Sequence, residues 1–191
     1  MFAQLDTKSV YSFMDSVVDL NTYVKRAKEL GYQSIGLMDR DNLYAAYHFA
    51  QLAIRNGLRP LIGTEANLFY EGRKIPFRLL AKNNQGYKNL MKLATELSSG
   101  QREFTYFSDY LNDIALILPS EDWEPGMSLG SEVFIGVRPE DAGKEFDYPV
   151  VPLHTVRYFE NADRSTIQTL HAISQNVSLS EVSICPMNQL L

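Results

Sequence analysis

Charged side chains recur where three short apolar segments of this sequence end. Asp6 and Lys8 follow the first segment, with Asp15 a little later; Asp39 and Arg40 end the second, and Glu65 ends the third. In a barrel of alternating strands and helices, the carboxyl ends of the strands surround one common opening. Carboxylates gathered there bind divalent metals or pair with cations. We therefore interpret these residues as the lining of one pocket.

The first hundred residues alternate between strand-like and helical segments. Apolar residues recur at helical spacing over 20–30, 43–54 and 87–97, and a glycine follows each run as a stop. Asn42 and Asn83 are the expected caps of the second and third helices. Strands should end at Asp39 and Glu65, and a hairpin should turn at Glu71-Gly72. This order predicts parallel strands joined by right-handed crossovers.

The apolar positions also predict which side chains face inward. The second half is less regular, with strands expected over 114–118, 133–137 and 150–153 and a last helix over 160–175. The expected inward faces of the second, third and last helices are Leu43, Ala46, Tyr47, Ala50 and Ile54; Tyr87, Leu90, Met91, Ala94 and Leu97; and Ile167, Leu170 and Ile173.

Length and composition limit the class of protein. At 191 residues the chain fits one domain, and 45% apolar with 21% charged residues is ordinary for a globular protein. No apolar run approaches the roughly 20 residues that span a bilayer, and no signal peptide precedes the first strand, so we expect a cytoplasmic protein without membrane contact. The single cysteine, Cys185, excludes an internal disulfide and a cysteine-based zinc cluster.

The charges are unevenly distributed along the chain. The net charge of −5 argues against a general nucleic-acid binder, and residues 103–147 hold eleven acids against Arg138 and Lys144. Residues 72–95 instead hold six basic side chains and no acid. These could contact nucleic acid or a neighbouring domain, or they could be solvated faces of a strand and a helix. They are Arg73, Lys74, Arg78, Lys82, Lys88 and Lys92.

Four stretches together resemble a known family. They are the run 24–31, the strand ending at Asp39, the segment 60–65 and the segment 79–93. This combination resembles the PHP (polymerase and histidinol phosphatase) domain that opens the alpha subunit of bacterial replicative DNA polymerase III. The resemblance is carried mainly by residues 2–98 and continues over 113–175, where the connections are shorter.

The resemblance implies an α/β fold, a distorted (β/α)7 PHP-type barrel. It also implies that residues 1–191 are a single PHP domain, the N-terminal fragment of a longer polymerase chain whose catalytic aspartates lie downstream. In active members of the family the barrel mouth binds up to three divalent metals and hydrolyses phosphoesters, and in some polymerases it proofreads DNA. The implied partners are the polymerase core of the same chain, other replisome subunits, and DNA through the full-length protein.

The sequence departs from the family at most of the metal-ligand positions. Only Asp15 and Glu65 match ligand positions. Where the family has its histidine motifs, this chain has Asp6-Thr7-Lys8, Asp39-Arg40 and Thr155-Val156-Arg157, and a further histidine position falls on Pro76. A cation cannot ligate a divalent metal and supplies the positive charge itself. We therefore expect no cofactor, and expect Asp6, Asp15 and Glu65 to face Lys8, Arg40 and Arg157 in an ion-pair network.

Several alternatives stay open from the sequence. The charges could point to solvent and never meet. His154, beside the expected mouth, could hold a residual divalent metal with two carboxylates. The chain would then be a metal-dependent phosphoesterase or a 3′–5′ proofreading exonuclease. A third possibility is a single-stranded DNA module that uses Tyr70, Phe77 and Tyr87 with the basic residues.

The remaining candidate residues give weaker evidence for a chemical role. Ser9 and Ser12 lack an obvious base that would make either of them a nucleophile. His48 and His171 lie within predicted helices and are expected to be packing or surface residues. The reading that the ion pairs favour is a non-catalytic structural or docking domain of a DNA-directed DNA polymerase.

Overall fold

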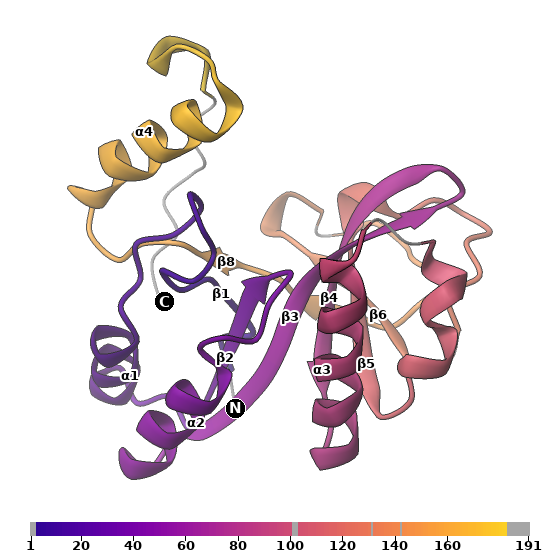
Figure 1. The fold of residues 1–191 in the computed structure, drawn as a ribbon, viewed down its shortest axis with the longest axis horizontal. Coiled ribbons are helices and arrows are strands. Elements are labelled where there is room, and N and C mark those ends of the chain that lie inside the picture. The colour runs from indigo at the N-terminus through magenta and orange to yellow at the C-terminus, as the bar shows by residue number, and fades with distance from the viewer. Residues whose placement is uncertain (1–2, 101–102, 131, 142, 183–191) are drawn as a thin grey trace. The chain divides into compact units, whose positions relative to one another are not determined.

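The computed structural model describes residues 3–100, 103–130, 132–141 and 143–182 as a mixed α/β fold. Cys185 lies outside the described residues. The chain divides into two compact units. The residues of each unit can be found in Figure 1 by the colour bar, which follows the residue number. The first takes its residues from 1–40, 44–61 and 154–191, and the second from 41–43 and 62–153. None of the described helices is long and apolar enough to cross a membrane.

The first unit is built from short strands and three helices. β1 pairs in parallel with β8, and Gln4 forms a parallel bridge with Ile35. Helices α1 and α2 pack against each other (Figure 1). The elements are β1 (Asp6–Thr7), α1 (Leu20–Glu29), β2 (Ser34–Arg40), α2 (Ala46–Arg55), β8 (Thr155–Val156), α4 (Asp163–Gln175) and a 3-10 turn at Leu179–Glu181.

The core of the first unit is centred on Tyr23, which is fully buried. Its ring stacks on Phe49 and Phe159 at centroid distances of 5.8 and 6.0 Å. Its hydroxyl donates to the Gly36 carbonyl at 2.9 Å and accepts a hydrogen bond from Thr7 at 3.0 Å. Burial raises the pKa of this phenol well above its usual value of 10, so it stays protonated. The hydroxyl thus links β1 to β2.

The backbone of Gln4 and Leu5, just before β1, lies very close to β2. The Gly36 amide donates to the Gln4 carbonyl at 2.6 Å, and a Cβ at Gly36 would lie 2.3 Å from the Leu5 carbonyl oxygen. Only glycine allows this contact.

The helices of the first unit follow the predictions in part. α1 begins after Asp19, which caps it by accepting from the Thr22 amide at 3.0 Å. The predicted cap of α2 at Asn42 is wrong, because the helix begins at Ala46 without a side-chain cap. Its predicted inward face is also wrong in part. Tyr47 and Ile54 are 74% and 61% exposed, whereas Phe49 is fully buried.

The second unit is a sheet with one long helix beside it. Within the second unit the strands follow the order β3-β4-β5-β6-β7, and the first residues of β3 belong to the first unit. The strands and helix are β3 (Arg59–Tyr70), β4 (Arg73–Ala81), α3 (Asn84–Ser98), β5 (Ile114–Pro119), β6 (Val133–Val137) and β7 (Val150–Pro152); 3-10 segments cover Phe104–Tyr110, Ser120–Asp122 and Pro139–Asp141. The predicted strands of the second half are confirmed.

The strands of the second unit pair in both parallel and antiparallel directions. β3 and β4 form the expected hairpin, and Glu71 and Gly72 have the positive φ angles of a tight turn, 50° and 78°. β5, β6 and β7 run parallel, but β4 and β5 are antiparallel. The 3-10 segment after α3 returns the chain to the end where β4 finished, and Lys82 donates to the Asp113 carbonyl there.

Helix α3 lies along β4 and β5 in Figure 1 and covers the core of the second unit. Asn83 caps it as predicted, accepting from the amides of Gln85 and Gly86 at 2.8 and 3.0 Å. Leu90 and Leu93 are buried, but Met91 is 42% exposed, against the prediction. In α4, Ile167 is buried as predicted, whereas Ile173 is 59% exposed. Each amphipathic stripe was therefore predicted only to within about one position.

Candidate functional site

Asp6 and Lys8 form a fully buried ion pair in the first unit. The Lys8 ammonium lies 2.9 Å from Asp6 Oδ1, and neither side chain is exposed to solvent. Lys8 also donates to the Met38 carbonyl at 2.6 Å, and Asp6 Oδ2 accepts from the Thr155 hydroxyl at 2.7 Å. The additional hydrogen bonds offset part of the desolvation cost of two buried charges. Both residues lie where β1 ends, as the sequence predicts.

Asp39 is held by the loop that follows β1. Its carboxylate accepts from the Ser9 amide, the Ser9 hydroxyl and the Ser12 hydroxyl, each at 2.7 Å. All three residues are buried. Three hydrogen bonds to the charged form stabilise a carboxylate in a buried position. The two serines therefore serve as donors that position Asp39 and the loop, a role that their sequence positions alone did not reveal.

Asp15 is the centre of a second charged cluster in the first unit. Its Oδ2 accepts from Arg40 Nη2 at 2.9 Å, and its Oδ1 accepts from Arg157 Nε at 2.9 Å. His171 Nε2 lies 3.0 Å from the same Oδ1. The Asp15 side chain is 5% exposed, the Arg157 side chain 15% and the Arg40 side chain 41%. Two guanidinium groups and an imidazole thus converge on one buried carboxylate.

Glu65 belongs to the second unit and has its partner there. Arg78 Nη2 lies 3.2 Å from Glu65 Oε2, and both side chains are almost completely buried. The two residues face each other directly across the β3–β4 hairpin. Arg78 also donates to the carbonyl of Pro76 at 2.7 Å. The sequence suggested that Arg78 could be one of a set of exposed basic residues. Its side chain is instead buried, unlike those of the other members of the set.

The other basic residues of 72–95 remain exposed, although two of them have partners. Arg73 pairs with Glu124 and donates to the Asp122 carbonyl, and Lys82 pairs with Glu132 at 2.6 Å. Lys74 lies on β4. Lys88 and Lys92 lie four residues apart, on the exposed face of α3.

Several partners of the predicted site residues were not expected from the sequence. His171 was expected to be a packing or surface residue, but it reaches Asp15 from α4. It lies four residues after the buried Ile167, so helical spacing already placed both on one face. Thr155 was named only as part of a motif, and its hydroxyl binds Asp6. His154 is half-buried, and its carbonyl accepts from the Gln4 side chain at 2.6 Å.

Comparison with known proteins assigns the family. A family model described as the PHP domain matches residues 4–125. The chain belongs to the PHP domain family. The DNA polymerase III subunit alpha of Streptococcus pyogenes serotype M1 is 45% identical over 191 residues, which is 99% of this chain and 18% of that protein. The subunit of Bacillus subtilis (strain 168) is 33% identical over 126 residues, covering 63% of this chain and 11% of that protein.

The chain therefore spans 18% of the length of the curated relatives that match nearly all of it. Among solved structures, an amidohydrolase from Chromobacterium violaceum with bound sulfate and no metal matches with a TM-score of 0.43 and 18% sequence identity. That match covers 51% of this chain and 34% of the amidohydrolase.

The residues at the family's ligand positions do not fit a divalent metal cluster. An ammonium group occupies the position beside Asp6, and both oxygens of Asp15 already accept from guanidinium groups. Across the described parts of the chain, His, Cys, Asp and Glu nowhere gather in a group of three or more that could hold a metal ion. A divalent ion brought to Asp6 or Asp15 would meet positive charge at contact distance, which opposes its binding.

Proposed function

We propose that this chain is the PHP domain of a DNA polymerase III alpha subunit and that the domain itself is non-catalytic. Its charged pocket would act as an internal brace in which lysine and arginine supply the positive charge of the family's metals. The observation that carries this proposal is the buried Lys8, bonded to both Asp6 and the Met38 carbonyl. The sequence similarity to the Streptococcus DNA polymerase III subunit alpha extends over nearly the whole chain. It supports the proposal that the parent protein is such a subunit.

The same proposal covers the domain organisation. Residues 1–191 would form one PHP domain, the N-terminal fragment of a longer polymerase chain. The finer architecture would be a distorted (β/α)7 barrel with shortened connections. The family match over residues 4–125 and the mixed α/β elements support this arrangement. The degenerate pocket would be lined in the first unit by Asp6, Lys8, Asp15, Asp39, Arg40, His154 and Arg157, whereas Glu65 belongs to the second unit.

The partners follow from the names of the relatives. We expect the domain to contact the polymerase core of its own chain, other replisome subunits, and DNA through the full-length protein. We also expect a cytoplasmic location. Exposed Lys74, Lys88 and Lys92 are the basic residues best placed for such a contact, with Arg73 and Lys82 beside acidic partners. Binding through them would weaken steeply with salt.

An activity assay with a matched variant tests the non-catalytic role. The 191-residue chain is incubated with Mn²⁺ or Zn²⁺ and either bis(p-nitrophenyl) phosphate or a 3′-labelled single-stranded oligonucleotide. We expect a rate equal to that of the Asp15→Asn variant in the same assay, since two-metal hydrolysis needs ligands that this site lacks. Hydrolysis that the wild type supports and Asp15→Asn loses would instead show a working phosphoesterase or exonuclease.

A further inference from the structure

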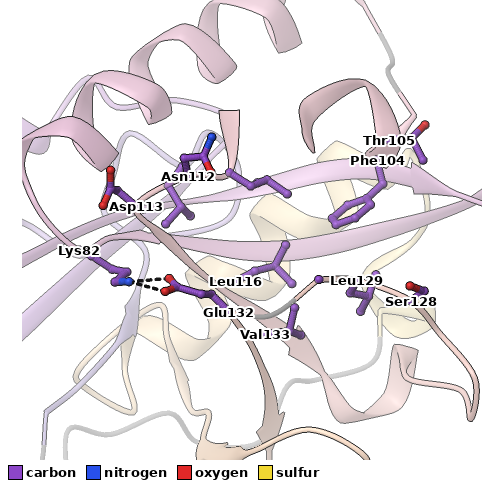
Figure 2. A pocket seen from close by; sticks show the side chains of 13 residues that line it. Lys82, Phe104, Thr105, Asn112, Asp113, Leu116, Ser128, Leu129, Glu132 and Val133 are labelled. Carbon is purple, nitrogen blue, oxygen red and sulfur yellow. Dashed lines mark hydrogen bonds and ion pairs between the residues drawn. The ribbon is translucent and has the colours of Figure 1, made fainter. Parts of the chain in front are cut away.

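The second unit contains a cavity of about 520 Å³, and its lining includes none of the residues expected to line the degenerate pocket. It is bounded by the start of the 3-10 segment Phe104–Tyr110, by the starts of β5 and β6, and by Ser128, Leu129, Gly130 and Glu132. Ligand-binding pockets typically measure roughly 300–1,000 Å³, so this one has the size of a binding site. Figure 2 shows Phe104, Leu116, Leu129 and Val133 along its floor, with Lys82 and Glu132 at one side.

The floor of the cavity is apolar and continuous with the core. Phe104, Leu116, Leu129 and Val133 are each less than 7% exposed and belong to the hydrophobic cluster of the second unit. Residual water over such a surface is displaced favourably by an apolar group of suitable size. A single aliphatic or aromatic side chain fills only part of the volume, so the occupant brings neighbouring atoms with it. This floor fits an apolar anchor within a longer ligand.

The walls of the cavity are fixed before anything binds. The Asn112 carbonyl accepts from Asn89 of α3 at 2.8 Å, and the Asp113 side chain accepts from Asn83 at 2.9 Å. A Cβ at Gly86 would lie 2.1 Å from the Asp113 carbonyl oxygen, so glycine allows α3 to approach this wall. A preformed wall reduces the ordering cost of binding.

The rim of the cavity is acidic. Asp113 and Glu132 line it beside the ammonium group of Lys82, and the exposed Glu103 directly precedes Phe104. Lys82 Nζ lies 2.6 Å from both oxygens of Glu132, and both side chains are nearly half exposed. Residues 103–147 as a whole hold eleven acids against two basic residues. This charge repels a nucleic-acid backbone and attracts lysine or arginine.

We infer that this cavity binds a peptide segment of a partner protein in which an apolar side chain is flanked by basic residues. The apolar side chain enters over Phe104, Leu116 and Val133, and the flanking cations contact Asp113 and Glu132 at the rim. A peptide satisfies both requirements, because it carries the charge beyond the apolar group that the cavity encloses. A purely apolar ligand would leave the acidic rim unused.

Methyl-labelled NMR on the 191-residue chain tests this site with three synthetic peptides. The probes are acetyl-Gly-Arg-Leu-Arg-Gly-amide, the same peptide with Ser for Leu, and the same peptide with Glu for both Arg. The first should shift the methyl signals of Leu116, Leu129 and Val133 in a saturable way. The other two should bind at least about tenfold more weakly, because they lack the buried anchor or reverse the charge.

Two sets of variants separate the site from a general charge effect. Asp113→Asn with Glu132→Gln should weaken the first peptide about fivefold, whereas Glu145→Gln, an exposed acid outside the cavity, should leave its affinity unchanged. Thr105→Trp fills the cavity from an exposed position and should reduce affinity at least about tenfold without lowering the melting temperature. Thr95→Trp on the exposed face of α3 is its control.

The following results would overturn the inference. The first peptide produces no saturable shift, or it binds no better than the serine peptide. A single-stranded oligonucleotide shifts the same three methyl groups. Thr105→Trp binds the first peptide as tightly as the wild type does.

Discussion

The ammonium group of Lys8 lies 2.9 Å from Asp6 Oδ1, and both side chains are completely buried. Neither charge has access to bulk water, so each depends on the other and on its hydrogen bonds. The family resemblance implies metal-binding histidines at the corresponding positions. A side-chain cation can thus supply the positive charge that this buried carboxylate needs, and the stability of the fold should depend on that cation.

Replacing Lys8 by methionine should destabilise the protein strongly. Lys8→Met keeps most of the volume but leaves Asp6 as an uncompensated buried charge, so we expect a loss of about 3–5 kcal/mol in the free energy of unfolding. Urea denaturation measures it. Adding Asp6→Asn should recover part of the loss. Lys25→Met removes an exposed lysine on α1 and should cost less than about 0.5 kcal/mol. Equal effects of Lys8→Met and Lys25→Met would contradict a buried pair.

The two arginines on Asp15 should contribute unequally. Arg157 is 15% exposed and Arg40 is 41% exposed, so water screens Arg40 more. We expect Arg157→Gln to cost about 1.5–3 kcal/mol and Arg40→Gln about 1 kcal/mol or less. Because both contact one carboxylate, the double variant should deviate from the sum of the single effects in a denaturation cycle. Strict additivity would mean that the two guanidiniums act independently of Asp15.

His171 should fix helix α4 to the Asp15 cluster. Loss of its contact with Asp15 Oδ1 in His171→Ala should cost about 1 kcal/mol, which corresponds to roughly fivefold faster local opening. Hydrogen exchange of the α4 amides measures this opening. His48→Ala, on the exposed surface of α2, is the matched control and should leave exchange in α4 unchanged. If both variants exchange like the wild type, the histidine contact does not hold the helix.

Which of these contacts could be predicted from sequence depends on how far apart the partners lie in the chain. The hairpin turn at Glu71-Gly72 places Glu65 opposite Arg78, so this pair could have been predicted from the position of the turn alone. Asp15 instead collects Arg40, Arg157 and His171 from three separate segments. Their convergence requires the fold of the whole first unit. Family resemblance supplied two of the three, while His171 matched no family ligand.

The helix faces show a different limit of sequence reasoning. Helix α2 is apolar around most of its circumference, with Tyr47 and Ile54 on one side and Phe49 and Ala53 on another. Its periodicity therefore cannot decide which side is buried. The stacking of Tyr23 on Phe49 decides it through tertiary packing. Strand positions were easier, because short runs such as Val133–Val137 are bounded by turn residues.

Asp141 should make the second unit less stable in acid. Its hydrogen bond with Lys144 and a further one from the Ser120 hydroxyl lower the pKa of the Asp141 carboxyl from 3.8 to about 2. A lowered pKa in the folded state stabilises the protein above the unfolded pKa, and the contribution is lost as the pH falls from about 4 to about 2. Asp141→Asn should thus lower the melting temperature at pH 7 but not near pH 2. Asp147→Asn, at an exposed position, should show no such pH-dependent difference from the wild type.

The most direct test of the cation-for-metal account is the metal content of the protein itself. The purified 191-residue chain is incubated with excess Zn²⁺ or Mn²⁺, desalted and measured by inductively coupled plasma mass spectrometry. Because Lys8, Arg40 and Arg157 already neutralise Asp6 and Asp15, we expect well below one metal ion per chain. One or more tightly bound ions per wild-type chain would contradict the account.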